Sequence, residues 1–239
     1  MLPKIAEQVG GGHRLVDQPP VLFHPDNPDA PKIFREAAKE YRSSLPDERR
    51  GLFDRYHLED FAVKVVGIGS VGTRCWAALF LSADGHPLLM QFKEATASVL
   101  EPYAGKSVYT NHGQRVVVGQ RLMQSASDIL LGWARSRLGY DFFGRQMRDM
   151  KLSFPSEGYT PASVKNYAEI CGLTLARAHA RAQSGDAAMI SGYLGKSDVF
   201  DEAIGDFAVA YADQTVQDHA KLAAAVKAGR VKARMEEDR

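Results

Sequence analysis

Three glycines at fixed spacing, with one lysine downstream, are the residues of this chain whose types could hold phosphate groups. Gly67, Gly69 and Gly72 fit the pattern G-x-G-x-x-G, and Lys93 follows in an otherwise apolar segment. Backbone N–H groups of such a loop can surround phosphate oxygens, and a lysine can reach the α- and β-phosphates of a nucleotide. The glycine pattern alone suits two different folds, so the elements around it must decide between them.

The segment after the third glycine predicts strands rather than a helix. In a dinucleotide-binding fold the glycines open a helix, whereas in a kinase the glycine-rich loop covers the phosphates and the lysine lies on a following strand. Here residues 73–81 are rich in β-forming side chains, Asp84-Gly85 suits a hairpin turn, and residues 88–93 form the returning strand. The pattern therefore favours a phosphate-binding hairpin loop. The predicted nucleotide contacts are Gly67, Gly69, Ser70, Gly72, Lys93 and Glu101.

Two alternatives to the kinase-type loop remain open. A dinucleotide-binding fold is one, and a plain antiparallel hairpin, whose lysine extends to solvent, is the other.

Glu101 is included as a candidate partner of the lysine. A kinase lysine pairs with a glutamate on the next helix, but the helix predicted over residues 111–125 contains no acid. Glu101 lies on the connection to that helix, and the alternative is a solvated loop glutamate. Glu94 adjoins Lys93 but should point to the opposite face of the sheet.

The segments before the glycines predict an irregular arm followed by helices. Glycines and prolines interrupt residues 1–31, and Pro31 then opens a helical pattern. One face of this helix is apolar and consists of Phe34, Ala37, Ala38, Tyr41 and Leu45. A short helix follows Pro46, with Leu52, Phe53 and Tyr56 inward, and the first strand is expected at residues 61–66.

The remaining elements complete an α+β fold. Short strands are expected at residues 129–131 and 140–143, and Thr160 with Pro161 starts a helical region that runs to the end. We therefore expect a protein-kinase-like N-lobe, a small antiparallel sheet of about five strands plus one helix, followed by a mainly helical region. The expected divisions are residues 1–60 for the arm and short helices, 61–151 for the nucleotide-binding lobe, and 152–239 for the helices.

Several other polar residues invite comparison with kinase sites. The cluster after residue 143, which consists of Arg145, Gln146, Arg148, Asp149 and Lys151, suits either an adenine-binding hinge or a polar surface turn. Asp186 and Asp206 resemble catalytic and metal-binding aspartates by position, but Phe207 lies on a helical stripe. We therefore favour structural roles for both aspartates, and the sequence assigns no catalytic base.

Composition excludes several other classes of site. The 30 basic and 29 acidic residues give a net charge of +1, which offers no overall reason to bind nucleic acid or an anionic membrane. No apolar run is long enough to span a bilayer, and the first residues are too polar for a signal peptide. The histidines show no paired ligand spacing, so no metal site is predicted. Cys75 and Cys171 are expected as reduced, buried thiols of a cytoplasmic protein.

Several segments together resemble the bacterial domain-of-unknown-function family 2252. They run through almost the whole chain, at residues 64–75, 91–95, 119–124, 145–151, 175–181, 184–186 and 211–214. That family looks related to aminoglycoside- and choline-kinase-like phosphotransferases. The resemblance implies ATP as the nucleotide and supports Gly67, Gly69, Gly72 and Lys93 as phosphate contacts.

The resemblance also implies that this chain corresponds to the second half of a longer family member. The upstream half of such members carries an aspartate-, histidine- and asparagine-containing motif like the catalytic loop of those kinases, and this sequence lacks it. We therefore expect the ATP-binding part of a kinase-like phosphotransferase, inactive alone, with magnesium required only in a complete enzyme. The expected partner is a second copy or a separately encoded catalytic half, and the alternative is a compact, self-sufficient monomer. A non-catalytic interaction module that retains the sheet is the alternative from another class.

Overall fold

The computed structural model describes residues 5–67, 72–147, 158–182 and 186–233. It divides the chain into two compact units, Met1–Gln183 and Ser184–Arg239. The strands of the first unit are β1 (Ala6–Val9), β2 (Gly12–Leu15), β3 (Leu22–Phe23), β4 (Tyr56–Lys64), β5 (Cys75–Ser82), β6 (Pro87–Ala95), β7 (Gly132–Arg135) and β8 (Asp141–Gln146). Its helices are α1 (Ala30–Ser44), α2 (Asp47–Phe53), α3 (Glu101–Ala104), α4 (His112–Met123) and α5 (Pro161–Arg181). The second unit contains α6 (Ala187–Leu194) and α7 (Val199–Lys227).

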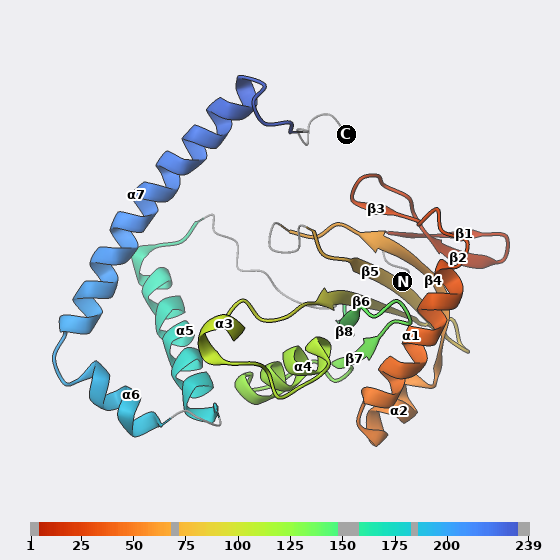
Figure 1. Ribbon diagram of the computed structural model, residues 1–239, viewed down its shortest axis with the longest axis horizontal. Coiled ribbons are helices and arrows are strands. Elements are labelled where there is room, and N and C mark those ends of the chain that lie inside the picture. The colour runs from red at the N-terminus through yellow and green to blue at the C-terminus, as the bar shows by residue number, and fades with distance from the viewer. Residues whose placement is uncertain (1–4, 68–71, 148–157, 183–185, 234–239) are drawn as a thin grey trace. The chain divides into compact units, whose positions relative to one another are not determined.

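A six-stranded antiparallel sheet forms the centre of the first unit (Figure 1). Its strand order is β3-β4-β5-β6-β8-β7, and every pairing among the described strands is antiparallel. The predicted mixed α+β class and antiparallel sheet are therefore confirmed. The first described element after Gly72 is strand β5, which begins at Cys75. A dinucleotide-binding fold, which needs a helix at that place, is thus excluded.

The N-terminal arm is more ordered than its sequence predicts. Strands β1 and β2 form a separate hairpin, in which Val9 pairs with Gly12. The two residues between them, Gly10 and Gly11, have φ angles of +57° and +87°. A two-residue hairpin turn favours positive φ at both central positions, so glycines that suggested an irregular arm make a tight turn instead. Strand β3 adds the sixth strand to the main sheet.

Most predicted elements are confirmed, with shifted ends. Helices α1, α2, α4 and α5 lie where local capping and apolar patterns place them. Strand β4 begins at Tyr56, so Tyr56 belongs to the sheet and not to the preceding helix. Strand β7 begins only at Gly132, and residues 129–130 form a turn before it. The expectation of a strand at residues 129–131 was therefore wrong.

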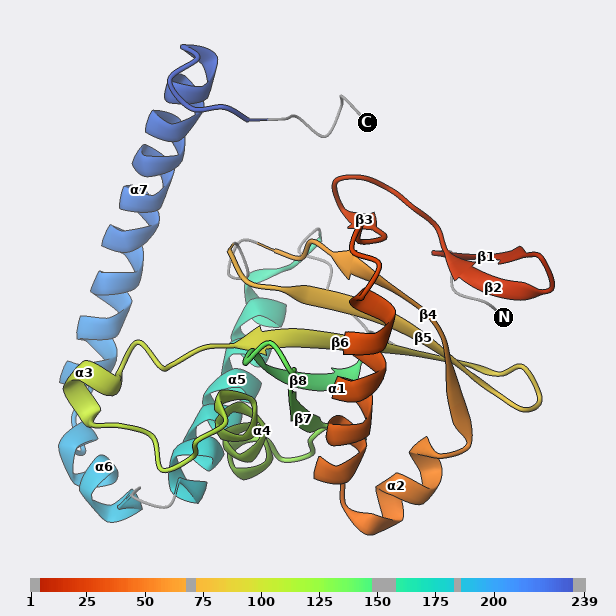
Figure 2. The ribbon, with the colours of Figure 1, turned by 45° about the vertical axis from the view of Figure 1, so that its right-hand side comes forward.

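One face of the sheet packs against α1. We call it the back face, and it carries Trp76, Ala78 and Phe80 of β5. Figure 2 shows α1 running across the strands. Tyr41 of α1 is fully buried here, and its hydroxyl donates a hydrogen bond to the Leu130 carbonyl. The crossing is close, because a Cβ atom on Gly144 would meet the Tyr41 ring at 2.7 Å.

The opposite front face is covered at two places. It carries Cys75, Ala77 and Leu79 of β5, since successive side chains of a strand alternate between faces. Ala77 and Leu79 form a core with Leu15 of the N-terminal hairpin. Farther along the sheet, helix α4 lies on the front face, where Asp141 of β8 accepts a hydrogen bond from the His112 backbone N–H at 2.8 Å. A stretch of the front face therefore lies between the hairpin and α4.

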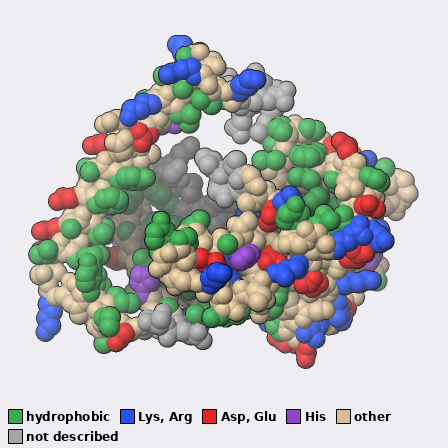
Figure 3. Space-filling view, in the orientation of Figure 1, with side chains coloured by type: hydrophobic (Ala, Val, Ile, Leu, Met, Phe, Trp, Pro, Cys, Tyr) green, Lys and Arg blue, Asp and Glu red, His purple; other side chains and the backbone are tan. Residues whose placement is uncertain are grey.

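Helices α5 and α7 leave large apolar side chains exposed. On α5 only Ala178 is buried, near the point where Arg181 donates to the Gln124 carbonyl at 3.0 Å. Cys171 is exposed, so the expectation that both cysteines are buried was wrong for Cys171 and confirmed for Cys75. Along α7, Phe207 and other apolar side chains are exposed. Figure 3 shows hydrophobic side chains at the surface of this helix. No helix among the described residues is long and apolar enough to cross a membrane.

Candidate functional site

The glycine segment joins the antiparallel strands β4 and β5. Gly67 and Gly72 are exposed on either side of this connection, and Gly72 has a φ of +81°. That angle is costly for residues with a Cβ atom, so a glycine suits the position. The two other predicted contacts of the loop, Gly69 and Ser70, lie outside the described residues.

Lys93 lies on the front face of β6, in the middle of the sheet. Its Cα partners are Cys75 on β5 and Phe143 on β8. The side chain is partly exposed, and within the described part of the chain it makes no ion pair. The hairpin connection followed by a strand that carries the lysine is the arrangement expected from the sequence.

Two further cations lie on the same face. Ala62 of β4 pairs with Ala77 of β5, so Lys64, two residues along β4, also points to the front and lies level with Cys75. Arg145 of β8 pairs with Gln91 of β6, two residues before Lys93, and therefore also points forward. Like Lys93, neither Lys64 nor Arg145 takes part in an ion pair between described residues. We call Lys64, Lys93 and Arg145 the cation cluster.

Cys75 lies between two members of the cation cluster, because it pairs with Lys93 on one side and is level with Lys64 on the other. Burial raises the pKa of the Cys75 thiol, while the positive charges of Lys93, Lys64 and Arg145 oppose that shift. The side chain of Gln91, only 7% exposed, lies beside the same thiol. Lys64 and Lys93 therefore flank this buried thiol, and Arg145 lies on the far side of β6 on the same face.

This arrangement can bind a polyanion. Like charges without partners repel one another, and an anion with several negative oxygens would relieve that repulsion. Lysine and arginine both donate charge-assisted hydrogen bonds to phosphate oxygens. A chain of phosphates beside the β4–β5 connection would also lie within reach of the backbone near Gly72.

Glu101 is not paired with the lysine. It begins helix α3, and no ion pair between described residues joins it to Lys93. Its Oε1 atom is buried, and no described residue forms a hydrogen bond with it. Glu94 lies on the back face, as expected, where it pairs with Arg74 at 3.0 Å. The cation cluster therefore contains no carboxylate of its own among these candidates.

The other candidates divide between sheet and helix positions. From the hinge cluster, Arg145 and Gln146 are the last residues of β8, while Arg148, Asp149 and Lys151 lie outside the described residues. Asp186 caps helix α6 by accepting hydrogen bonds from the Ala188 and Met189 N–H groups. Asp206 lies inside helix α7. Asp186 therefore has the structural role favoured for it, and the helical pattern predicted around Asp206 is confirmed.

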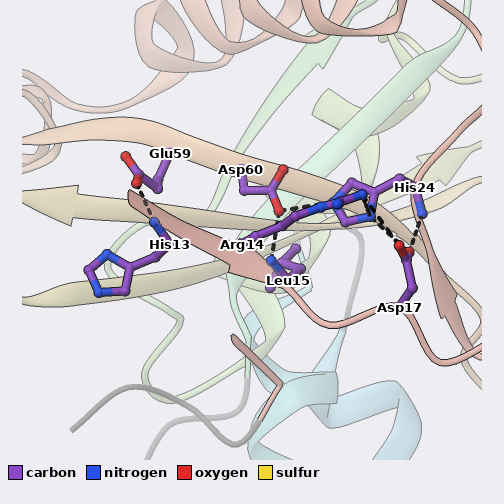
Figure 4. A network of polar contacts seen from close by, with 7 residues as sticks. All are labelled: His13, Arg14, Leu15, Asp17, His24, Glu59 and Asp60. Carbon is purple, nitrogen blue, oxygen red and sulfur yellow. Dashed lines mark hydrogen bonds and ion pairs between the residues drawn. The ribbon is translucent and has the colours of Figure 1, made fainter. Parts of the chain in front are cut away.

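A second polar network anchors the N-terminal segment to β4 (Figure 4). The ring nitrogens of His24 lie 2.8 Å from an Asp17 oxygen and 2.9 Å from an Asp60 oxygen. Asp60 also accepts a hydrogen bond from the Leu15 N–H at 2.7 Å, and Glu59 accepts one from the His13 N–H at 2.7 Å.

A bulge in β4 makes this anchoring possible. Glu59 and Asp60 are neighbours, and neighbours in a regular strand point to opposite faces. The register of β4 against β5 shifts between Leu58 and Asp60, which lets both carboxylates reach β2. We therefore assign this network to holding the N-terminal hairpin on the sheet.

Sequence reasoning missed most of the cation cluster. Lys64 was not singled out, and Arg145 was considered only as part of a hinge. The alternation along each strand places both on one face, but only the strand register brings them together. Among the described residues, no group of three or more His, Cys, Asp or Glu could hold a metal ion.

The comparisons with known proteins identify the family. The family described as "Uncharacterized protein conserved in bacteria (DUF2252)" matches residues 1–225, so the chain belongs to this family. No curated protein and no solved structure matches the chain.

Proposed function

We propose that this member of the DUF2252 family binds the phosphates of a nucleotide, ATP, on the front face of its sheet. The observation that carries the proposal is the convergence of Lys64, Lys93 and Arg145 on that face without anionic partners among the described residues. The triphosphate would lie across these three side chains, next to the connection between Gly67 and Gly72.

The order of the elements supports a kinase-like lobe as the finer form of this proposal. A glycine-rich hairpin, a lysine on the following strand and a helix after that strand are the parts that hold ATP phosphates in protein kinases. Here β4, β5, β6 and α4 follow in that order, and α4 lies on the same face of the sheet as Lys93. Because α4 contains no acid, Lys93 would be held by the ligand rather than by a helix carboxylate.

We assign nucleotide binding to this chain, but not phosphoryl transfer. Phosphoryl transfer needs an aspartate that orients the acceptor hydroxyl and further groups that hold magnesium. Asp186 caps a helix and Asp206 lies within one, so neither is proposed for these roles. The transfer chemistry would come from a separate catalytic part, supplied by a partner chain.

Calorimetry with Mg-ATP, ADP and adenosine tests the proposal. Because the cation cluster contacts phosphates, affinity should fall from ATP to ADP and vanish with adenosine, and it should weaken as salt rises. No heat at millimolar Mg-ATP with a folded sample, or equal affinity for adenosine, would overturn it.

A second candidate is a non-catalytic interaction module. The observation that favours it is the exposure of large apolar side chains along α5 and α7, such as Ile170 and Phe207. Contiguous exposed apolar surface is typical of sites that bind another protein. Under this alternative the purified chain would associate with a partner but show no response to any nucleotide.

A further inference from the structure

A cavity of about 210 Å³ lies between helix α1 and the back face of the sheet. It is separate from the cation cluster, because Phe92 lines it while the neighbouring Lys93 points to the front. Its walls are almost entirely apolar, and they include Phe34, Ala38, Trp76, Phe92 and Phe142.

Packed aromatic rings hold the cavity open. The Phe34 ring is stacked on the Phe61 ring, with centroids 4.5 Å apart. Phe34 also makes an edge-to-face contact with Phe92, with ring centroids 5.5 Å apart. The Trp76 ring lies on the same wall, with its centroid 5.8 Å from that of Phe61. These ring contacts support the wall against collapse into the space. The space is partly open to solvent, so a bound apolar molecule would remove the aromatic walls from water.

The polar end of the cavity carries no net charge. Arg74 lines this end, with its guanidinium carbon 3.7 Å from the centre of the Tyr140 ring. Its Nη1 donates to both carboxylate oxygens of Glu94, at 3.2 and 3.0 Å. Because Glu94 neutralises Arg74, the cavity offers a polar rim and aromatic walls but little attraction for an anion.

The size and the chemistry together define the ligand. An apolar cavity of about 150 Å³ accepts benzene, so the larger space here suits a bicyclic ring of about nine heavy atoms. Flat rings pack well against aromatic walls in offset or edge geometry. We propose that this cavity is a binding site for a neutral, flat aromatic molecule about the size of indole. The site is independent of nucleotide binding, although its ligand would touch the back of strands β5 and β6.

Binding of 5-fluoroindole, followed by fluorine NMR, tests the proposal. A ligand of this size that fills the cavity should bind with a Kd between about 10 µM and 1 mM. Ala38→Leu places a larger side chain in the cavity and should weaken binding at least about tenfold. Ala212→Leu, the same change on the exposed surface of α7, is the matched control and should leave the Kd unchanged.

Two measurements on the unaltered protein keep the test independent of how Ala38→Leu folds. Bound 5-fluoroindole should show NMR contacts to the ring protons of Phe34 or Trp76, and 4-fluorobenzoate, an anion of similar size, should bind more weakly. Absence of saturable binding, contacts only to other parts of the protein, or tighter binding of the anion would overturn the proposal.

Discussion

Replacing Lys93 should separate nucleotide binding from folding. Lys93 makes no ion pair with the described residues and shares the front face with two other cations. Lys93→Met keeps an aliphatic stem of similar length and removes only the charge. We therefore expect the midpoint of thermal unfolding to stay the same or rise, because one of three mutually repelling charges is removed.

The expected loss of affinity follows from the contact that the charge would make. A hydrogen bond to a charged group contributes about 1.5–3 kcal/mol. Lys93→Met should thus weaken Mg-ATP binding by about 10- to 150-fold in calorimetry. The salt dependence of the remaining affinity should also be shallower than that of the unaltered protein.

Lys39→Met is the matched control for this prediction. Lys39 is exposed on α1, the helix that covers the back face of the sheet. This variant should bind Mg-ATP as the unaltered protein does. Equal affinity of Lys93→Met and Lys39→Met would refute the placement of the phosphates. Loss of folding in Lys93→Met alone would refute the argument that the lysine has no structural partner.

The remaining predictions concern stability and association. Gly144→Ala should lower the free energy of unfolding in urea by about 1–3 kcal/mol, because its Cβ would meet the Tyr41 ring at 2.7 Å. Gly119→Ala should instead raise the free energy of unfolding by about 0.5–1 kcal/mol, because a Cβ atom at this helical position meets nothing within 4 Å. A lower free energy of unfolding would contradict the open surface at Gly119. Burial raises the pKa of the Asp17 and Asp141 carboxyls, but other interactions outweigh burial and hold both pKa values below the ordinary range. These interactions are the hydrogen bonds between His24 and Asp17 and the ion pair between Arg135 and Asp141. The stability that these two carboxylates contribute should therefore be complete above about pH 4 and be lost as the pH falls through their lowered pKa values. In Asp141→Asn the free energy of unfolding should fall less steeply with decreasing pH. Light scattering should find a species heavier than the monomer, because α5 and α7 expose large apolar side chains, whereas a stable monomer would count against a docking surface on these helices.

Elements with local start signals were predictable from the sequence. Thr160 and Pro161 open α5 with a capping box that also uses Ser163, and Asn111 caps α4 through the Gln114 N–H. These contacts join residues three positions apart, so the sequence pattern contains all the information that they need. The hairpin turn at Gly85, which has a φ of +76°, was predictable for the same reason.

The cation cluster and the N-terminal hairpin were not predictable in that way. Lys64 and Arg145 lie far apart in the sequence, and they share a face only because β4, β5, β6 and β8 pair in the observed register. The hairpin at the N-terminus is held by Glu59 and Asp60, whose side chains point the same way because of a bulge. A bulge inserts one residue into the alternation, and no local pattern in the sequence predicts its position.

Labelling with an acyl phosphate of ATP would show whether the front face binds nucleotide phosphates. In this reagent a lysine amine attacks the acyl carbon, an amide forms, and ATP leaves as the acyl–phosphate bond breaks. The reaction therefore marks lysines that lie beside bound phosphates. We predict that mass spectrometry finds the acyl group on Lys93 or Lys64, and that excess ATP suppresses this labelling. Labelling that excess ATP leaves unchanged, or that falls on exposed lysines such as Lys39 as heavily as on Lys93, would contradict the claim that this face binds nucleotide phosphates.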